Sequence, residues 1–182
     1  MTDARDRLYL QMLVVRCQTG DRAALEELVG RCQPRLRVFL HKLLGRPGPV
    51  DDLSQEVWAD VVRDLARLSD PAAFLPWFYR IARNRAYRLF RGRREPADSI
   101  DSIDPDLAAA EEPEFSAEDA RAVHAALDQL GSEHREALVL RFMEEMTYEQ
   151  IAAVAGCQVG TIRSRIHNAK RRLRTILERQ KV

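Results

Sequence analysis

The chain has 182 residues, of which 46% are hydrophobic and 31% charged, and its 29 basic and 28 acidic side chains give a formal net charge of +1. This composition is typical of a globular protein and excludes a disordered or fibrous chain. The first 21 residues carry scattered charges and only a short apolar run, so they resemble neither a secretory signal nor a membrane-spanning helix. We therefore expect a cytoplasmic protein that is not inserted in a membrane.

The three cysteines, Cys17, Cys32 and Cys157, are odd in number and have no CxxC spacing. Few histidines lie near them in the sequence, so a disulfide framework or a structural zinc site is not expected. We predict buried, reduced thiols and neither a bound metal nor a cofactor. The alternative is a redox or metal switch formed by Cys17, Cys32 and His41, whose side chains would have to converge from separate turns.

The charges are sorted along the chain. Residues 1–94 hold 18 basic and 11 acidic side chains, residues 95–119 hold 10 acids and no base, and residues 120–182 hold 11 bases and 7 acids. Two basic blocks around an acidic connector are typical of two modules that each meet a polyanion. The connector would be repelled from that polyanion, or would cover a basic surface when no DNA is present.

Apolar residues recur at steps of three and four, and no stretch alternates as a strand would, so the sequence predicts an all-α fold. The predicted helices span residues 3–17, 21–44, 51–68, 71–93, 117–130, 132–144, 147–155 and 158–179. Gly20 and Asp21 mark the start of the second helix, which Pro34 is expected to interrupt. Asp70 and Pro71 fit an N-cap and a first-turn proline.

Residues 95–116 contain three prolines, many acids and few large apolar groups. Such a segment cannot repay the entropy of ordering a packed structure, so we expect a flexible acidic linker. It separates two small helical domains, residues 1–94 and 117–182, each long enough to bury a modest core.

The third predicted helix has one apolar stripe and one acidic face. The stripe is formed by Leu53, Val57, Val61 and Leu65. Away from it lie Asp52, Gln55, Glu56 and Asp60, which leaves an acidic and amide-rich face available to a partner. An ordinary solvated face is the alternative. Catalysis would need a converging nucleophile, histidine or set of metal ligands, and the sequence supplies none, so we do not expect an enzyme.

The fourth predicted helix, FLPWFYRIARNRAYRLFRGRR at 74–94, combines aromatic side chains with seven arginines and has no acid from Arg80 onward. Guanidinium groups neutralise phosphates and exposed rings stack on bases, so this composition favours single-stranded DNA. Packing in the core is the better interpretation for Phe74 and Phe78, whereas Trp77 and Tyr79 could pack or stack. The arginines would repel one another unless a polyanion met them.

Residues 147–174, TYEQIAAVAGCQVGTIRSRIHNAKRRLR, predict two short helices around a tight turn. Thr147 and Gln150 have the spacing of a capping box, and Gly156 permits the turn. The apolar seam of the second helix consists of Val159, Ile162, Ile166, Ala169 and Leu173. Its opposite face carries groups suited to a DNA major groove, namely Gly160, Thr161, Arg163, Ser164, His167, Asn168 and Arg171. A helix-turn-helix is therefore predicted, with a solvated basic surface helix as the alternative.

Three motifs, in their order along the chain, resemble the extracytoplasmic-function (ECF) sigma factors, the two-domain branch of the bacterial sigma-70 family. The motifs are DDLSQEVW at 51–58, FLPWFYRIARNRA at 74–86 and the segment 126–173, which begins ALDQLGSEHREAL. The resemblance covers nearly the whole chain. It implies a sigma-2-like domain at 1–94 and a sigma-4-like domain at 117–182. It also implies three partners, which are core RNA polymerase, promoter DNA and an anti-sigma factor, and a protein that is monomeric when free.

The same resemblance implies roles for particular residues. Those that would grip the polymerase's largest catalytic subunit are Asp51, Asp52, Gln55 and Glu56. Those that would melt and read the minus-ten promoter element are Trp77, Tyr79, Arg80, Arg83, Asn84, Arg91, Arg93 and Arg94, with Ser69 and Asp70 beside a flipped base. Those that would read the minus-thirty-five element are Thr161, Arg163, Ser164, His167 and Asn168, with Lys170 and Arg171 near the DNA backbone.

Three positions depart from the family's pattern. Arg88 stands where many relatives have an acid, Gly131 where many have proline and Asn168 where many have arginine. Asparagine can bond adenine through two hydrogen bonds whereas arginine favours guanine, so we expect an altered base choice opposite Asn168.

Two other functions remain open from the sequence. A stand-alone helix-turn-helix regulator, whose amino-terminal half senses a signal or dimerises, would bind its operator without polymerase. A sigma-like decoy would bind an anti-sigma protein without touching DNA, but the arginines retained at 80–94 and 163–174 argue against it.

Overall fold

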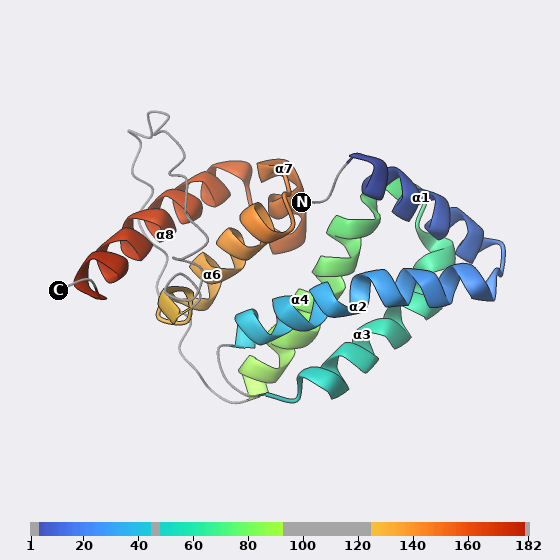
Figure 1. Ribbon diagram of the computed structural model, residues 1–182, viewed down its shortest axis with the longest axis horizontal. Helices are drawn as coiled ribbons and strands as arrows, with labels where there is room; N and C mark the ends of the chain where they lie inside the picture. Colours follow the sequence, from blue (N-terminus) through green and yellow to red (C-terminus); the bar gives the residue numbers. More distant parts are fainter. Residues whose placement is uncertain (1–3, 45–47, 93–124, 181–182) are drawn as a thin grey trace.

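The computed structural model describes residues 4–44, 48–92 and 125–180, and within these ranges the chain is helical and contains no strand, which confirms the all-α prediction (Figure 1). The predicted linker at 95–116 lies outside the described residues. The helical elements are α1 (Ala4–Gln18), α2 (Arg22–Leu44), α3 (Val50–Asp64), η1 (Leu65–Arg67), η2 (Pro71–Ala73), α4 (Phe74–Gly92), α6 (Ser132–Leu138), the π-helix η4 (Val139–Met143), α7 (Tyr148–Ala155) and α8 (Val159–Gln180). None of the described helices is both long enough and apolar enough to cross a membrane.

Helices α1 to α4 form the first module, and all four contribute buried residues to its core, in which α3 packs on α4. The predicted stripe of α3 is buried along its whole length. On α4 the facing residues recur every four positions and are equally buried, namely Phe74, Phe78, Ala82 and Ala86. The Phe78 ring lies 5.1 Å from the Trp58 ring and 5.6 Å from the Phe74 ring, between centroids. The prediction that Phe74 and Phe78 are core residues is therefore confirmed.

The prediction that Pro34 interrupts the second helix is wrong, because α2 runs through it from Arg22 to Leu44. A proline inside a helix removes one backbone hydrogen bond and costs about 3 kcal/mol. Leu28, Cys32, Leu36 and Leu40 of α2 are all buried at four-residue steps on either side of it. Burial of four side chains, at about 1.5 to 3 kcal/mol for each large one, exceeds that cost.

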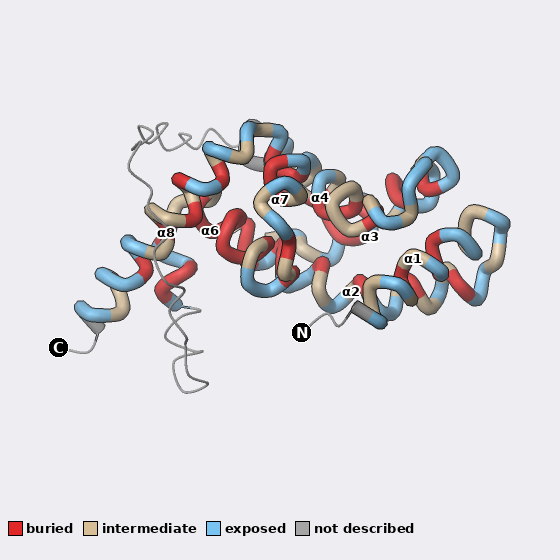
Figure 2. The backbone as a smooth tube through the Cα atoms, turned by 90° about the horizontal axis from the view of Figure 1, so that it is seen from above, coloured by how far each residue is buried: buried red, intermediate tan, exposed pale blue. Residues whose placement is uncertain are grey.

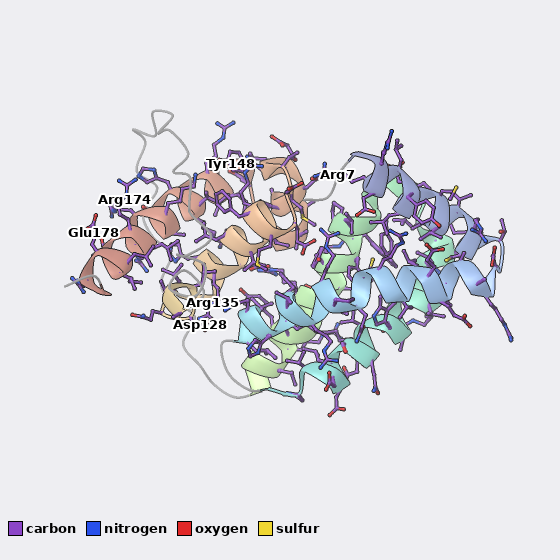
Figure 3. The ribbon with its side chains drawn as sticks, in the orientation of Figure 1. Arg7, Asp128, Arg135, Tyr148, Arg174 and Glu178 are labelled. Carbon is purple, nitrogen blue, oxygen red and sulfur yellow. The ribbon has the colours of Figure 1, made fainter. Side chains whose placement is uncertain are left out.

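The second module contains the predicted helix-turn-helix. Thr147 Oγ1 accepts a hydrogen bond from Gln150 N at 3.2 Å, and Gln150 Oε1 accepts one from Thr147 N at 3.0 Å, so the capping box is confirmed. Gly156 ends α7 in the left-handed conformation, with φ of 68°. The seam residues of α8 from Ile162 to Leu173 are buried against the rest of the module. Its outer end, which carries Arg174 and Glu178, points away from the first module (Figures 2 and 3).

The second half of one helix in the second module differs from its predicted form. The predicted helix 132–144 is α-helical only to Leu138 and continues as a π-helix over Val139–Met143, where Glu144 N donates to Val139 O at 3.3 Å. A π turn holds one residue more than an α turn. Residues eight positions apart therefore lie on one face here, where a regular α-helix aligns residues seven apart.

The two modules pack against each other. Helix α4 contacts α7, and α2 contacts α6, so the second module covers one side of the first (Figure 1). Arg135 of α6, which is 7% exposed, donates to the carbonyl of Lys42 in the last turn of α2 at 2.8 Å. An arginine at this place satisfies a carbonyl that the helix end leaves without a partner.

We expect substitution Thr147→Ala to lower the free energy of unfolding by about 1 kcal/mol, because it removes the side-chain acceptor of the capping box. The control is Thr175→Ala on α8, whose hydroxyl, among the residues described, bonds only the Arg171 carbonyl of its own helix at 3.2 Å. That change should stay within about 0.5 kcal/mol. Urea denaturation of the two variants measures the difference, and equal losses would contradict a stabilising role for the cap.

Candidate nucleic-acid and partner surfaces

The first candidate surface is the outer face of α3. Asp51, Asp52, Gln55 and Glu56 are all exposed there. Asp51 pairs with Arg37 of α2 at 2.9 Å, and Glu56 pairs with Arg85 of α4 at 2.9 Å. Asp52 and Gln55 have no hydrogen-bonding partner among the described side chains, so a protein that docks on this face would meet them first.

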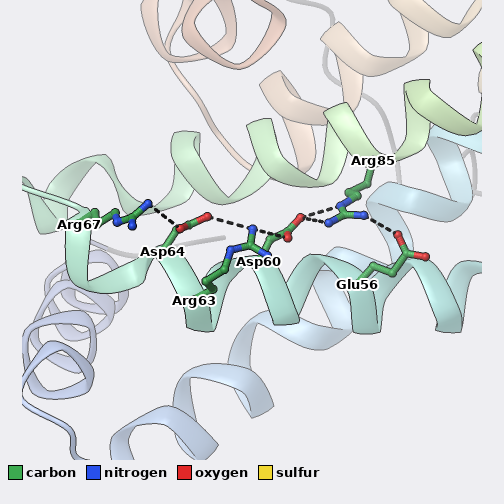
Figure 4. Close-up of polar contacts among 6 residues, drawn as sticks. All are labelled: Glu56, Asp60, Arg63, Asp64, Arg67 and Arg85. Carbon is green, nitrogen blue, oxygen red and sulfur yellow. Dashed lines mark hydrogen bonds and ion pairs between the residues drawn. The ribbon is translucent and has the colours of Figure 1, made fainter.

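The sequence predicts that Asp60 belongs to this exposed face, but in the structure it does not. It is 8% exposed and accepts hydrogen bonds from Arg85 Nε and Arg63 Nη2, each at 2.6 Å. Burial raises the pKa of the Asp60 carboxyl, but the hydrogen bonds from the two arginines outweigh it and hold the pKa below its usual value. Arg85 also donates to Glu56 Oε2 at 2.9 Å, so one guanidinium joins two carboxylates of α3 to α4 (Figure 4).

The second candidate surface is the solvent side of α4. Arg80, Asn84 and Arg88 are exposed and have no ion pair among the described residues, whereas Trp77 is half-buried. Ser69 and Asp70 are exposed in the preceding turn, where Asp70 Oδ1 accepts from Ala72 N at 2.9 Å as the predicted cap. The Arg91 side chain and residues Arg93 and Arg94 lie outside the described part of the chain.

Two residues predicted to hold DNA face the second module instead. Tyr79 is 1% exposed, its ring packs at 4.9 Å from that of Phe39, and its hydroxyl hydrogen-bonds Glu144. Arg83 Nε lies 2.7 Å from Glu136 Oε1. In this arrangement Tyr79 cannot stack on a base, and Arg83 already has an anionic partner.

The sequence predicts that the arginines of α4 repel one another, but acidic side chains of other helices form ion pairs with some of these arginines. Asp60 and Glu56 neutralise Arg85, and Glu136 neutralises Arg83. The expectation that only a polyanion could balance these arginines is therefore wrong for two of them. The sequence could not show this, because the balancing acids are 25 to 53 residues away along the chain.

Two buried carboxylates of the second module reach the first. Glu136 of α6 is 2% exposed, forms the ion pair with Arg83 and accepts a hydrogen bond from the Tyr87 hydroxyl at 3.1 Å. Glu144, directly after the π-helix, is 5% exposed and lies 2.9 Å from Arg35 Nη2 of α2. Burial raises the pKa of both carboxyls, and the neighbouring arginines reduce that rise without cancelling it. No sequence motif singles out either residue, because buried acids have no pattern of their own in a sequence.

The third candidate surface is the exposed side of α8. Arg163 and Arg171 are exposed, whereas Thr161, His167, Asn168 and Lys170 are half-buried. Ser164 is 7% exposed, and its hydroxyl lies 3.0 Å from the Thr161 carbonyl and 3.2 Å from that of Gly160. Its contact with DNA stays a prediction, because its hydroxyl already has acceptors within its own helix.

The cysteines do not come together. Cys32 is buried, which raises the pKa of its thiol to about 12, and Cys17 and Cys157 are half-buried and unpaired by disulfides. No group of three or more histidine, cysteine, aspartate or glutamate residues able to hold a metal ion occurs in the described ranges.

The fold and these surfaces define a class of protein: two packed helical modules, one with an arginine-rich aromatic helix and one with a helix-turn-helix. Known sequences match both modules. The family description Sigma-70 region 2 matches residues 28–95, and Sigma-70, region 4 matches residues 120–173.

Relatives extend the match over most of the chain. It is 36% identical over 135 residues to the ECF RNA polymerase sigma-E factor of Escherichia coli (strain K12), covering 68% of this chain and 71% of that protein. It is 33% identical over 172 residues to the RNA polymerase sigma-H factor of Pseudomonas aeruginosa (strain PAO1), covering 88% and 89%. The chain belongs to the sigma-70 family of RNA polymerase sigma factors, within its ECF branch.

Two solved structures also resemble this chain over most of its length. CnrH in complex with the cytosolic domain of CnrY superimposes with a TM-score of 0.66 at 25% identity, over 93% of this chain and 97% of that one. RpoE in complex with the anti-sigma factor NepR from Bartonella quintana gives a TM-score of 0.64 at 27% identity, over 85% and 96%.

We expect Asp60→Asn to lower the free energy of unfolding at pH 7 by about 2 kcal/mol, since it removes the charge that Arg85 and Arg63 bond. The pKa of Asp60 is lower in the folded chain than the unfolded value of about 3.9. Its contribution is therefore complete above that pH and disappears as the pH falls through the folded pKa. Urea denaturation between pH 7 and pH 3 should show the difference from the parent shrinking.

Proposed function

We propose that this protein is an alternative sigma factor, which binds core RNA polymerase, directs it to particular promoters and helps open the DNA there. The observation that carries the proposal is the pairing, in one chain of this family, of the arginine and aromatic helix α4 with the helix-turn-helix of α7 and α8. The subunit contributes binding and positioning and not catalysis, and it needs no cofactor. It acts in the cytoplasm, where polymerase and chromosome are.

We assign a different binding partner to each of the three surfaces. The exposed acids and amide of α3 suit a basic or polar partner and are assigned to core polymerase, with Asp52 and Gln55 free to bind it. The outer side of α4, with Arg80, Asn84 and the half-buried Trp77, is assigned to the minus-ten element. The exposed side of α8 is assigned to the major groove of the minus-thirty-five element. The domain limits proposed for this division are 1–94 and 117–182.

Core polymerase compensates for the weak DNA binding of each module alone. Each module presents a small DNA-binding surface, so each binds duplex DNA weakly. Once polymerase fixes the distance between them, the second contact becomes intramolecular and gains effective concentration. Unstacking bases of the minus-ten element costs a few kcal/mol per step, which captured bases and neutralised phosphates offset without nucleotide hydrolysis.

An anti-sigma factor is the proposed regulatory partner. The support is the similarity to RpoE, which was solved in complex with the anti-sigma factor NepR, over 85% of this chain. Such a partner would act by covering surfaces that polymerase and promoter need.

We expect specific initiation only when the protein is added to core polymerase, and run-off transcription on a genomic promoter library measures it. The double variant Asp52→Ala, Gln55→Ala should bind core polymerase at least about tenfold more weakly, the effect of losing 1.4 kcal/mol. It disrupts no described side-chain contact, so the fold should persist. The control is Glu26→Ala, which changes an exposed acid of α2. Operator binding without polymerase would instead favour the stand-alone regulator.

We expect Asn168→Arg to shift base preference in the minus-thirty-five element from adenine toward guanine opposite that residue. The physical reason is the different pair of hydrogen bonds that each side chain can make in the major groove, worth about 1 to 3 kcal/mol of discrimination. Selection of binding sites from a randomised promoter, carried out with the holoenzyme, compares the two proteins. An unchanged preferred sequence would show that Asn168 does not read a base.

A further inference from the structure

The turn between η1 and η2 lies at the amino-terminal end of α4. Its residue Ser69 is exposed, forms a bend and has no hydrogen-bonding partner among the described residues. Through η2 the turn leads directly into Phe74, the first residue of α4, and Trp77 follows within one turn. A DNA strand on the outer side of α4 would therefore pass Ser69, whose hydroxyl can donate to or accept from the edge of an unstacked base.

We propose that Gln18, the last residue of α1, is a positioning residue for promoter specificity, because it fixes the turn that presents Ser69 to the minus-ten strand. The proposal rests on the function proposed above, since it takes α4 to hold that strand. A residue on a turn reads a base well only when neighbouring side chains hold the turn in place. Gln18 precedes Leu68 of this turn by 50 residues, so no sequence motif joins the two.

Gln18 holds the turn through both donors of its side-chain amide. Its Nε2 donates to the Leu65 carbonyl at 3.0 Å and to the Leu68 carbonyl at 2.7 Å. An amide nitrogen carries two N–H groups, so these bonds use its whole donor capacity. Leu65 directly follows α3 and Leu68 follows η1, so both carbonyls lie where a helix leaves its last acceptors without partners. Gln18 supplies those partners from a different helix.

The bond to Leu68 bears directly on Ser69. The Leu68 carbonyl belongs to the planar peptide group that also contains the Ser69 nitrogen, so holding its oxygen sets the plane from which Ser69 starts. On the other side, the Asp70 carbonyl accepts from Ala73 N at 3.0 Å. Pro71 also restricts Asp70 to the extended conformation that it has, with φ of −119° and ψ of 107°. Ser69 is thus held between two fixed peptide groups.

The two exposed residues of this turn therefore have different tasks. The Asp70 carboxylate caps η2, accepting from Ala72 N at 2.9 Å, and its negative charge repels a phosphate backbone. Ser69 is uncharged and its hydroxyl has no partner among the described residues. We assign the base contact to the Ser69 hydroxyl, whereas Asp70 and Gln18 hold the two ends of the turn.

The end of α1 that carries Gln18 is itself tied to α2. Arg16 donates to Asp21 Oδ2 through Nε at 2.9 Å and through Nη2 at 2.7 Å. Asp21 Oδ1 at the same time accepts from Ala24 N at 3.1 Å, which caps the first turn of α2. Gly20 makes the tight turn between the helices in the left-handed conformation, with φ of 88°. The Gln18 amide therefore reaches the turn from a defined position.

The test is Gln18→Met, which keeps the length of the side chain and removes both donors. Holoenzyme binds fluorescein-labelled strands of a promoter selected in the run-off assay, with each base and an abasic nucleotide placed in turn along the minus-ten element. Gln18→Met should lose about tenfold of the parent's base preference at one position, yet bind the strand that is abasic there as tightly as the parent. The matched control is Gln11→Met on the same helix, at a half-buried glutamine without a hydrogen-bonding partner among the described residues, and it should keep the preference.

A second comparison shows whether Gln18 acts through Ser69. Ser69→Ala should remove the same base preference, and adding Gln18→Met to it should change nothing further, because the two residues contribute to one contact. Gln18→Glu replaces the donor nitrogen by an oxygen and should behave as Gln18→Met does. Either Gln18 variant can decide if circular dichroism shows that the other does not fold.

Three results would overturn the proposal. They are an unchanged base preference in a folded Gln18 variant or in Ser69→Ala, losses that add in the double variant, and a loss that is as large on the abasic strand. Unfolding of both Gln18 variants would show a role in the fold alone and would overturn it too. A parent protein that directs no initiation with core polymerase would instead refute the proposed function, so the two failures are distinguishable.

Discussion

Burial of two carboxylates without access to water decides how this molecule is arranged. Glu136 and Glu144 are 2% and 5% exposed, and a charged group in that position needs cationic and hydrogen-bonding partners. The arginine and tyrosine partners that the structure shows for these carboxylates come from α2 and α4 of the first module. The packed position of the modules meets that requirement, because Arg83 and Tyr87 contact Glu136 while Arg35 and Tyr79 contact Glu144.

Side chains that suit nucleic-acid recognition serve folding here. Arginine and tyrosine donors that suit a phosphate also suit a carboxylate, so the protein's own acids can stand where a nucleic acid would. The Asp60 network shows the other outcome: Arg85 is held between Asp60 and Glu56 inside the first module, where it ties α3 to α4. Of the arginines on α4 whose side chains the structure describes, Arg80 and Arg88 are exposed to solvent.

Local features of the sequence were sufficient for most of the fold. The apolar stripes of α3 and α8, the capping box at Thr147 and the left-handed Gly156 depend on residues within one or two turns, so spacing alone predicts them. The prediction for Pro34 was wrong because it included the local cost of a proline in a helix but not the burial of the residues around it. The sequence did not predict the π-helix at 139–143, because its apolar pattern is almost that of an α-helix. The motifs located all three candidate surfaces, although the roles of single residues stay predictions.

The sequence by itself thus determined most of the helices, the two modules and the family, because periodicity, capping and motif order are all written in neighbouring residues. Only the tertiary structure decided which charges are free. Asp60 and Asp52 lie eight residues apart on one helix, yet one is buried between two arginines and the other meets solvent. Burial and pairing depend on helices that are distant in the chain, and electrostatic energy depends on distance in space, which no one-dimensional pattern records.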